Sequence, residues 1–239
     1  MSVWWLLIGT IAVLICYTAL PELIFHILHL TVTYKQKKVS RKIIALTFDD
    51  GPDPHYTPQV LQILDQYHAK ATFFLVGSRA AKHPGLVEAI LRAGHDIANH
   101  SWFHVNAWFQ LPLQTIREIS ATRNELQRLS GRAIRYYRPP WGMFNAVTRF
   151  ACATLGLHPV LWSVSSYDWR TGDTTRDIVR RVCQSQAGDI VLMHDNGGAP
   201  GAPLNTIRAL PIILEHLSED GFAFVTVSEL EAQKATAAE

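Results

Sequence analysis

The chain has 239 residues, of which 48% are hydrophobic and 18% are charged, and its net charge is +2 at pH 7. This length supports one substantial domain, with two small domains as the alternative, and the composition excludes a disordered chain. Nucleic-acid binding would need a broad basic face, so we expect no nucleic-acid partner. The three cysteines have no paired or zinc-ribbon spacing and are predicted to be free thiols.

The first element is an uncharged apolar segment, residues 3–20 (VWWLLIGTIAVLICYTAL), which continues after Pro21 and Glu22 to Val32. Its eighteen residues would reach about 27 Å as a helix, close to the hydrocarbon thickness of a bilayer. A cleaved signal peptide would need a basic start and a small-residue cleavage site, and the sequence has neither. We therefore predict a single-pass membrane anchor over residues 1–33, with a long buried helix as the alternative.

A basic run, residues 34–42 (YKQKKVSRK), follows the apolar segment, and no Lys or Arg precedes that segment. We interpret this run as a juxtamembrane linker. The positive-inside rule then predicts a cytoplasmic domain after it. Because a bias of a few charges is a tendency and not a barrier, our preferred prediction is a domain outside the cell membrane.

From residue 42 onward, apolar β-branched runs alternate with segments of helical spacing. The runs cover residues 42–48, 71–77, 95–100, 134–140, 158–164, 188–195 and 222–227. The helical segments cover about residues 58–68, 84–93, 113–130, 146–155, 175–186 and 204–218. This alternation predicts an α/β domain over residues 43–230, a distorted (β/α) barrel of about seven strands. An open doubly wound sheet is the alternative, and residues 231–239 are predicted to be a flexible tail.

Unusual polar residues fall where these strands end. They are Asp49, Asp50, His100, Arg138, Asp168 and His194. In α/β barrels and open α/β sheets alike, the carboxyl edge of the strands is where functional sites are assembled. We therefore expect these side chains to meet in one site.

A metal site is the first hypothesis for this edge. His100 and His104 are four residues apart in HSWFH, so in a helical turn both imidazoles would point the same way. With Asp50 they form a His, His, Asp set that would leave an open position on zinc. Two surface histidines on a turn are the alternative interpretation.

The adjacent acids Asp49 and Asp50 repel each other unless a cation or a shared proton relieves them. A metal held by one acid would leave the other free as a general base. Gly51 permits a sharp turn after the pair and Pro52 fixes its exit. A solvated Asp-Gly turn is the competing interpretation of the same letters.

Three later residues have a functional and a structural interpretation. Arg138 precedes two prolines in YRPPWG and could orient a carboxylate, or it could form a surface salt bridge. Asp168, in SYDW, is either a caged carboxylate or a strand cap. His194 ends an apolar strand as a candidate general acid, or as a satisfied structural histidine.

Five motifs occur in order over this domain: TFDDGP, HSWFH, RPPWG, SYDW and LMH. Together they resemble the polysaccharide deacetylases of carbohydrate esterase family 4, also called the NodB homology domain, over about residues 40–230. The resemblance implies a distorted (β/α) barrel and metal-dependent hydrolysis of N-acetyl groups on amino sugars. The implied metal is zinc, although cobalt or another divalent ion could serve.

The resemblance also implies roles for single residues. Asp50, His100 and His104 would bind the metal, and Asp49 would be the catalytic base. Arg138 would hold that base in place.

Around these residues, Pro140 and Trp141 would form a groove wall, with a backbone N–H aimed at the oxyanion. His194 would be the catalytic histidine, and Asp168, next to Trp169 in the Asp-Trp pair, would tune it. Leu192 would line the apolar wall around the acetate methyl group.

The chain departs from the family at Ser165, where many members have an acid.

Three functions remain open from the sequence. The preferred one is N-deacetylation of an acetylated glycan, such as peptidoglycan or another N-acetylhexosamine polymer. The second is deacylation of a lipid-linked amino sugar at the membrane. The third is a carbohydrate-binding domain without catalysis, which the intact set of candidate residues disfavours.

Overall fold

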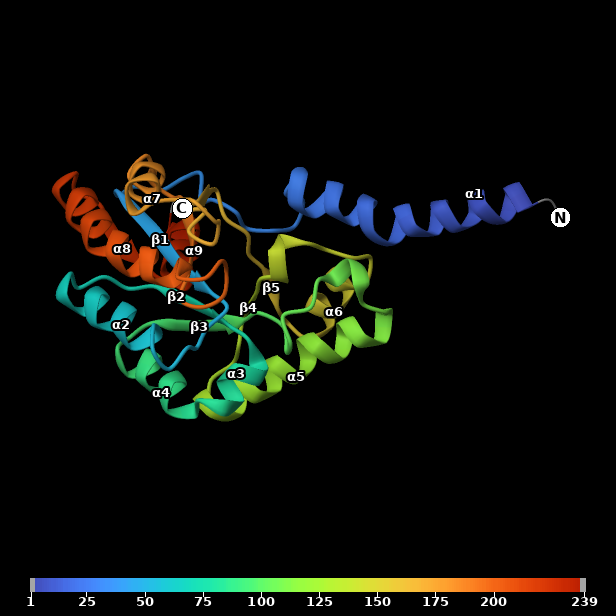
Figure 1. Cartoon of the computed structure of the whole chain (residues 1–239), viewed down its shortest axis with the longest axis horizontal. Coiled ribbons are helices and arrows are strands. Elements are labelled where there is room, and N and C mark those ends of the chain that lie inside the picture. Colours follow the sequence, from blue (N-terminus) through green and yellow to red (C-terminus); the bar gives the residue numbers. More distant parts are fainter. Residues whose placement is uncertain (1–2, 237–239) are drawn as a thin grey trace.

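One parallel sheet forms the centre of the computed structural model, which describes residues 3–236 and the side chains up to residue 233. Its strands are β1 (Ile43–Asp49), β2 (Thr72–Leu75), β3 (Asp96–Asn99), β4 (Tyr136–Tyr137), β5 (His158–Pro159), β6 (Val164–Ser165), β7 (Ile190–His194) and β8 (Ala223–Val225). The strand order is β5-β4-β3-β2-β1-β7-β6, with β8 paired to β1. This path ends at β5 and β6 without closing, so the sheet forms an incomplete barrel (Figure 1). The predicted distorted (β/α) barrel is confirmed.

Helices follow most strands and cover the outer face of the sheet, except the last one, which packs on its inner side (Figure 1). They are α2 (Thr57–Gln66), α3 (Gly77–Lys82), α4 (Pro84–Arg92), α5 (Pro112–Ser130), α6 (Thr148–Thr154), α7 (Thr175–Val182), α8 (Ala202–Glu219) and α9 (Val227–Thr236). Short 3₁₀ turns, η3 (Ala107–Phe109) and η4 (Pro140–Gly142), interrupt the loops. The sequence predicted six of these helices and missed α3 and α9. Helix α9 runs into the region predicted to be a tail, and residues 237–239 of that region lie outside the described residues.

Strand β1 shows how the sheet separates core from site. All seven of its residues are buried. Ile44, Leu46 and Phe48 belong to the core between the sheet and the outer helices. Ile43 and Ala45 belong to a smaller inner cluster, in which Val227 and Leu230 of α9 also pack. Because side chains alternate along a strand, the residues that follow on this inner face are Thr47 and Asp49.

The predicted strand over residues 158–164 divides into β5 and β6. Between them the backbone carbonyls of Val160 and Leu161 accept hydrogen bonds from the Arg138 side chain, at 3.2 and 2.9 Å. The strand is therefore interrupted where its backbone carbonyls accept hydrogen bonds from a buried guanidinium instead of pairing with a neighbouring strand.

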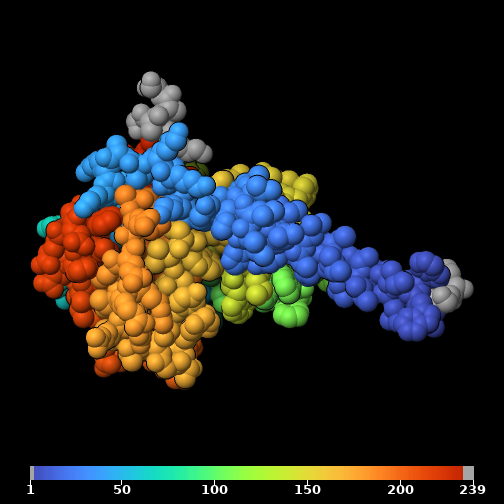
Figure 2. All heavy atoms as spheres, turned by 90° about the horizontal axis from the view of Figure 1, so that it is seen from above, coloured from blue at the N-terminus to red at the C-terminus, as the bar shows by residue number. Residues whose placement is uncertain are grey.

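The apolar N-terminal segment projects from one end of the domain (Figures 1 and 2). It comprises α1 (Val3–Leu14) and two π-helical stretches, η1 (Ile15–Ala19) and η2 (Glu22–Ile27). By length and composition this helix, Val3–Ile27, could cross a membrane, with a mean hydropathy of 2.1, and a signal sequence would have the same properties.

The end of this segment packs on the domain. Glu22 accepts a hydrogen bond from the Phe144 backbone N–H at 3.1 Å, and the rings of Phe25 and Phe144 lie 5.4 Å apart. The residues that follow also contact the domain, since Lys35 forms an ion pair with Asp189 at 2.9 Å. The division into anchor, linker, catalytic domain and tail stays a prediction.

Candidate active site

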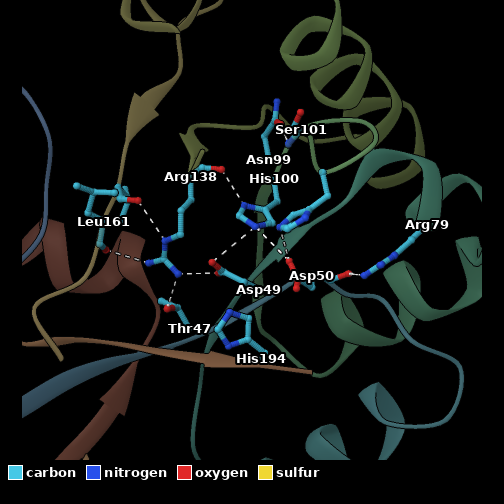
Figure 3. A network of polar contacts seen from close by, with 12 residues as sticks. Thr47, Asp49, Asp50, Arg79, Asn99, His100, Ser101, Arg138, Leu161 and His194 are labelled. Atoms are coloured by element: carbon cyan, nitrogen blue, oxygen red, sulfur yellow. Dashed lines mark hydrogen bonds and ion pairs between the residues drawn. The ribbon is translucent and has the colours of Figure 1, made fainter. Parts of the chain in front are cut away.

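Polar side chains from several strands meet in a groove at the carboxyl edge of the sheet (Figure 3). The groove has a volume of about 480 Å³. Its lining includes eight of the eleven residues singled out from the sequence: Asp49, Asp50, His100, His104, Trp141, Trp169, Leu192 and His194. Of the other three, Arg138 and Asp168 are buried behind the groove, and Pro140 is buried in η4.

The acid doublet turns at Asp50 itself. Asp49 is the last residue of β1, and Asp50 has a backbone φ of 76°. Neighbours in an extended strand point to opposite faces, whereas this left-handed residue turns the chain so that both carboxylates line the groove. The turn was predicted from the sequence at Gly51 and Pro52, and in the structure it begins one residue earlier.

Three potential metal ligands converge beside the doublet. One ligand atom from each of Asp50, His100 and His104 lies within 4.8 Å of the others. The Nε2 atoms of His104 and His100 lie 2.9 and 3.3 Å from Asp50 Oδ1, a buried oxygen with no hydrogen bond from any other group of the described residues. On the far side of its ring, His100 Nδ1 donates to the Arg138 carbonyl at 2.8 Å, which leaves its Nε2 lone pair facing the other ligands.

This donor set suits a divalent metal. Two imidazole nitrogens and one carboxylate form a set that zinc accepts while keeping a position open. Burial alone would raise the pKa of Asp50, but the imidazoles of His100 and His104 hold that pKa well below its usual value. Asp50 is therefore ionised, and its buried oxygen, which faces two imidazole nitrogens and has no other hydrogen-bond donor, is the observation that fits a cation best.

Arg138 holds the other acid of the doublet. Its side chain is 0% exposed, and Nη1 donates to Asp49 Oδ1 at 2.7 Å and to Thr47 Oγ1 at 2.8 Å. The guanidinium also stacks over the Phe74 ring, 4.0 Å from its centroid. One Asp49 oxygen is thus fixed by a buried ion pair, while Oδ2 lies on the side of His100, 3.8 Å from Nε2.

His194 is oriented by Asp168 in the same manner. Its Nδ1 donates to Asp168 Oδ1 at 2.7 Å, and its backbone N–H donates to Oδ2 at 2.8 Å. Thr206 donates a third hydrogen bond to this carboxylate at 2.6 Å. Burial lowers the pKa of His194, but Asp168, with the further charges of Asp50 and Asp49, raises it to about 9. The imidazole is therefore protonated at neutral pH and has its Nε2 free of Asp168.

Aromatic side chains flank the polar centre of the groove. Trp141 is 54% exposed and its ring lies 4.4 Å from the His104 ring, while Trp169 is 42% exposed. Such exposed indole faces are suited to stacking on sugar rings. Leu192 and Ser165 also line the groove.

The backbone around the groove adopts an unusual conformation. Eight non-glycine residues of the described chain have positive φ. Five of them belong to the groove or the histidine loop: Asp50, Ser101, His104, Trp141 and Tyr167. Left-handed backbone costs roughly 1–2 kcal/mol per L-residue, and such residues cluster at functional sites where the surrounding structure holds them.

Glu118, a buried residue of α5, was not predicted from the sequence. Its Oε2 accepts hydrogen bonds from Ser101 Oγ at 2.9 Å and from the backbone N–H groups of Trp102 and Phe103 at 3.0 and 2.9 Å. One carboxylate therefore fixes the loop between the two candidate metal histidines. Its position in the middle of a helix, distant from every motif, gave no sequence signal.

The N-terminal segment also supplies a groove residue. His26 lines the groove, pairs with Glu22 at 2.6 Å, and its ring lies 5.9 Å from that of Trp162. No sequence motif includes this histidine, because only the packing of η2 on the domain brings it to the groove.

Two glycines allow close approach around the doublet. A Cβ at Gly51 would lie 2.5 Å from the carboxylate oxygens of Asp195, and a Cβ at Gly197 would clash with Asp50 Oδ2. Burial and the nearby charge of Asp50 raise the pKa of Asp195 to about 7, although a hydrogen bond from Thr57 opposes this. Arg79 completes the surroundings by donating to the Asp50 carbonyl.

The chain is similar to known proteins over most of its length. The family model for polysaccharide deacetylase matches residues 36–160. The chain is 39% identical over 193 residues to a peptidoglycan-N-acetylglucosamine deacetylase of Bacillus cereus, covering 80% of this chain and 89% of that protein. It is 34% identical over 197 residues to the peptidoglycan-N-acetylmuramic acid deacetylase PdaC of Bacillus subtilis, covering 82% of this chain and 40% of that longer protein.

A solved structure shows the same fold. The peptidoglycan deacetylase PdaC from Bacillus subtilis superposes with a TM-score of 0.75 and 33% sequence identity. The superposition covers 83% of this chain and 94% of that one.

Proposed function

Since the chain belongs to the polysaccharide deacetylase family, carbohydrate esterase family 4, we propose that it hydrolyses N-acetyl groups on the amino sugars of a glycan. The products would be a free amino sugar and acetate. One observation carries this proposal: Asp49 and His194, each oriented by a buried charged partner, flank the Asp50, His100 and His104 set in one groove.

A divalent metal, most simply zinc, would be held by Asp50, His100 and His104. When bound it would supply Lewis-acid polarisation of water and of the acetyl carbonyl. The chain supports such binding through the Arg138 carbonyl, which accepts from His100 Nδ1 and so fixes the tautomer of that ring.

Asp49 is our candidate for the general base. Its carboxylate would take a proton from the attacking water as the new carbon–oxygen bond forms. Arg138 would keep this carboxylate aligned, because four hydrogen bonds hold the guanidinium on Asp49, Thr47 and two backbone carbonyls.

The oxyanion that develops on the former carbonyl needs a fixed donor. In the turn at η4 the Gly142 N–H donates to the Pro139 carbonyl, and the Met143 N–H to the Pro140 carbonyl. We assign the oxyanion to the remaining donor of this turn, the Trp141 N–H.

His194 is our candidate for the general acid. Collapse of the tetrahedral species breaks the carbon–nitrogen bond, and the leaving amine then needs a proton. His194 would donate it from Nε2, because Nδ1 is occupied by Asp168. The raised pKa of His194, about 9, supports this role at neutral pH.

The substrate we propose is peptidoglycan or another N-acetylhexosamine polymer. The exposed rings of Trp141 and Trp169 would stack on sugar units beside the reacting one. The names of the two relatives specify different sugars, N-acetylglucosamine and N-acetylmuramic acid. The substrate experiment below must therefore distinguish between these two sugars.

Deacylation of a lipid-linked amino sugar is the second candidate. It is favoured by His26, which the apolar N-terminal segment contributes to the groove wall.

We propose that this segment anchors the chain in the cell membrane with the catalytic domain outside. Two lysines of the basic run contact the domain: Lys35 forms an ion pair with Asp189, and Lys42 donates a hydrogen bond to the Asp220 carbonyl. These contacts weaken the inference of a cytoplasmic domain from the positive-inside rule.

Acetate release from a panel of substrates tests the proposal. The full chain with zinc would be incubated with peptidoglycan, an N-acetylglucosamine oligomer and a polyprenyl-linked N-acetylhexosamine. We expect acetate and free amine in equal amounts from a polymeric glycan. Release from the lipid-linked sugar alone would establish the second candidate, and glycan binding with no release would support a binding domain.

A further inference from the structure

Exposed apolar side chains of the domain gather in one stretch. In the described chain after residue 30, ten large hydrophobic side chains are exposed, and five of these lie within residues 103–113. Four form what we call the junction patch: Trp108, Phe109, Leu111 and Leu113, exposed by 37%, 83%, 74% and 57%. Residues 105–116 contain no Asp, Glu, Lys or Arg. An uncharged, exposed cluster of this kind marks an interaction surface.

Hydrogen bonds fix the junction patch to the apolar N-terminal segment. Tyr17 Oη donates to the Gln110 carbonyl at 2.6 Å. Asn145 Nδ2 donates to Tyr17 Oη at 3.1 Å and to the Ala107 carbonyl at 2.8 Å. In Figures 1 and 2 the green segment lies against the base of the blue helix, at the end of the domain from which the helix projects. The patch and the helix are therefore one structural unit.

This contact falls inside the apolar helix and not at its end. The helix that could cross a membrane extends from Val3 to Ile27, so it continues for about 15 Å of helix length beyond Tyr17. Leu20, Leu23 and Ile27 in that part are still exposed by 44%, 43% and 63%. If the helix lies in a membrane, the domain surface beside Tyr17 lies at the boundary between lipid and water.

We propose that the junction patch inserts into the membrane interface beside the anchor helix, so that the domain rests on the lipid surface. Trp side chains concentrate at such interfaces, and Phe and Leu enter about 5–10 Å into the boundary between headgroups and acyl chains. Because the patch carries no charge, a zwitterionic bilayer is sufficient and anionic lipid is not required. The inference rests on the proposed membrane placement of the helix and not on the deacetylase chemistry.

The consequence concerns the height of the groove above the membrane. A helix followed by a free linker would let the groove reach distant substrate. A seated domain holds the groove at one distance, because η2 contributes His26 to the groove and joins the helix that carries Tyr17. The substrate reached is then the glycan nearest the membrane surface.

Site-specific fluorescence of the full chain tests this seating. Cys16 is exposed and Cys183 partly exposed, so both are replaced by Ser, while the buried Cys152 stays. Single cysteines at Leu113, at Ile11 of the helix and at Ile212 of α8 are labelled with an environment-sensitive dye. The protein is reconstituted in phosphatidylcholine vesicles and quenched either by aqueous iodide or by lipids spin-labelled in the acyl chain. Ile212 is the matched control, an apolar residue 47% exposed on α8.

We expect the Leu113 and Ile11 labels to be quenched by the spin-labelled lipid, and the Ile212 label by iodide, with several-fold contrast between Leu113 and Ile212. A Leu113 label that behaves like Ile212 while Ile11 is quenched by lipid would overturn the seating alone. Lack of lipid quenching at Ile11 would overturn the membrane placement and the seating together. Protection of Leu113 from both quenchers that disappears on dilution would identify a second copy of the chain as the occupant, and would also refute the proposal.

Discussion

Asp49 and His194 are register partners at the carboxyl ends of β1 and β7, two adjacent parallel strands. The pairing continues back through Ala45 and Ile190, so a run of ladder positions fixes the relative height of the two end residues. A base and an acid that act on one bond need such fixed geometry. Each then receives its own buried orienting partner, Arg138 for Asp49 and Asp168 for His194.

Replacement of the candidate base tests its role directly. Asp49→Asn keeps the shape of the side chain but removes the proton acceptor, so we expect a loss of roughly 10²- to 10⁴-fold in kcat. Metal content, measured by elemental analysis, should stay unchanged because Asp50, His100 and His104 remain. The buried guanidinium of Arg138 also loses its counter-charge, which we expect to destabilise the fold by roughly 3–5 kcal/mol.

Asp65→Asn, at an exposed position of α2, is the control, because it removes one negative charge and should change neither kcat nor stability. Full activity of the Asp49→Asn protein with metal still bound would show that another group is the base.

The pH dependence of the reaction reports on His194. Its folded-state pKa of about 9 lies above its ordinary value of 6.5, so the protonated acid is lost as the pH rises through about 9. By the same linkage the stability from its ion pair is full below 6.5 and disappears through about 9. A bound divalent cation would move this pKa lower.

Asp168→Asn removes the main group that raises the pKa of His194. The alkaline limb of the kcat profile should therefore move to lower pH, as measured by pH–rate profiles of both proteins. Asp220→Asn, an exposed substitution, should leave the limb in place. An alkaline limb that is the same in the Asp168→Asn protein would contradict the assignment of His194 as the acid.

Gly197 tests whether the close approach to Asp50 matters. Its φ is 74°, and a Cβ there would clash with Asp50 Oδ2. Gly197→Ala should therefore weaken zinc binding, measured by competition with a chromophoric chelator, and lower activity with it. Gly221→Ala introduces comparable left-handed strain at φ 81° with open space around the Cβ, so it separates backbone strain from the contact. Equal zinc affinity in the two variants would show that the contact is unimportant.

Glu118 should position the histidine loop without touching substrate. Glu118→Ala removes the acceptor of three hydrogen bonds, and we expect zinc affinity to fall roughly 10- to 100-fold. Glu118→Gln keeps an oxygen acceptor and should restore much of that affinity, whereas a residue needed only for its charge would not be rescued. Gln114→Ala, exposed on the same helix, is the control.

Sequence alone predicted the barrel because apolar runs of strand length alternate with helical spacing over the whole domain. It also singled out residues that the fold brings to one groove, because polar residues at strand ends share the carboxyl edge of a parallel sheet. It could not find Glu118 or His26, since each reaches the site through tertiary packing of a helix that carries no motif. It also assigned the turn of the doublet to Gly51, because a left-handed Asp50 is rare enough that residue type does not predict it.

Metal-dependent release of acetate is the central claim, and one titration tests it most directly. Bound metal is removed from the full chain with a chelator, and the protein is then incubated with an N-acetylated glycan. The untreated protein is assayed on the same glycan in parallel. Acetate is then measured as zinc is added back. We predict no release from the stripped protein and full recovery at one zinc per chain, with none recovered by the Asp50→Asn protein. Release that continues in the stripped protein, or no release from any N-acetylated glycan with zinc bound, would contradict the account.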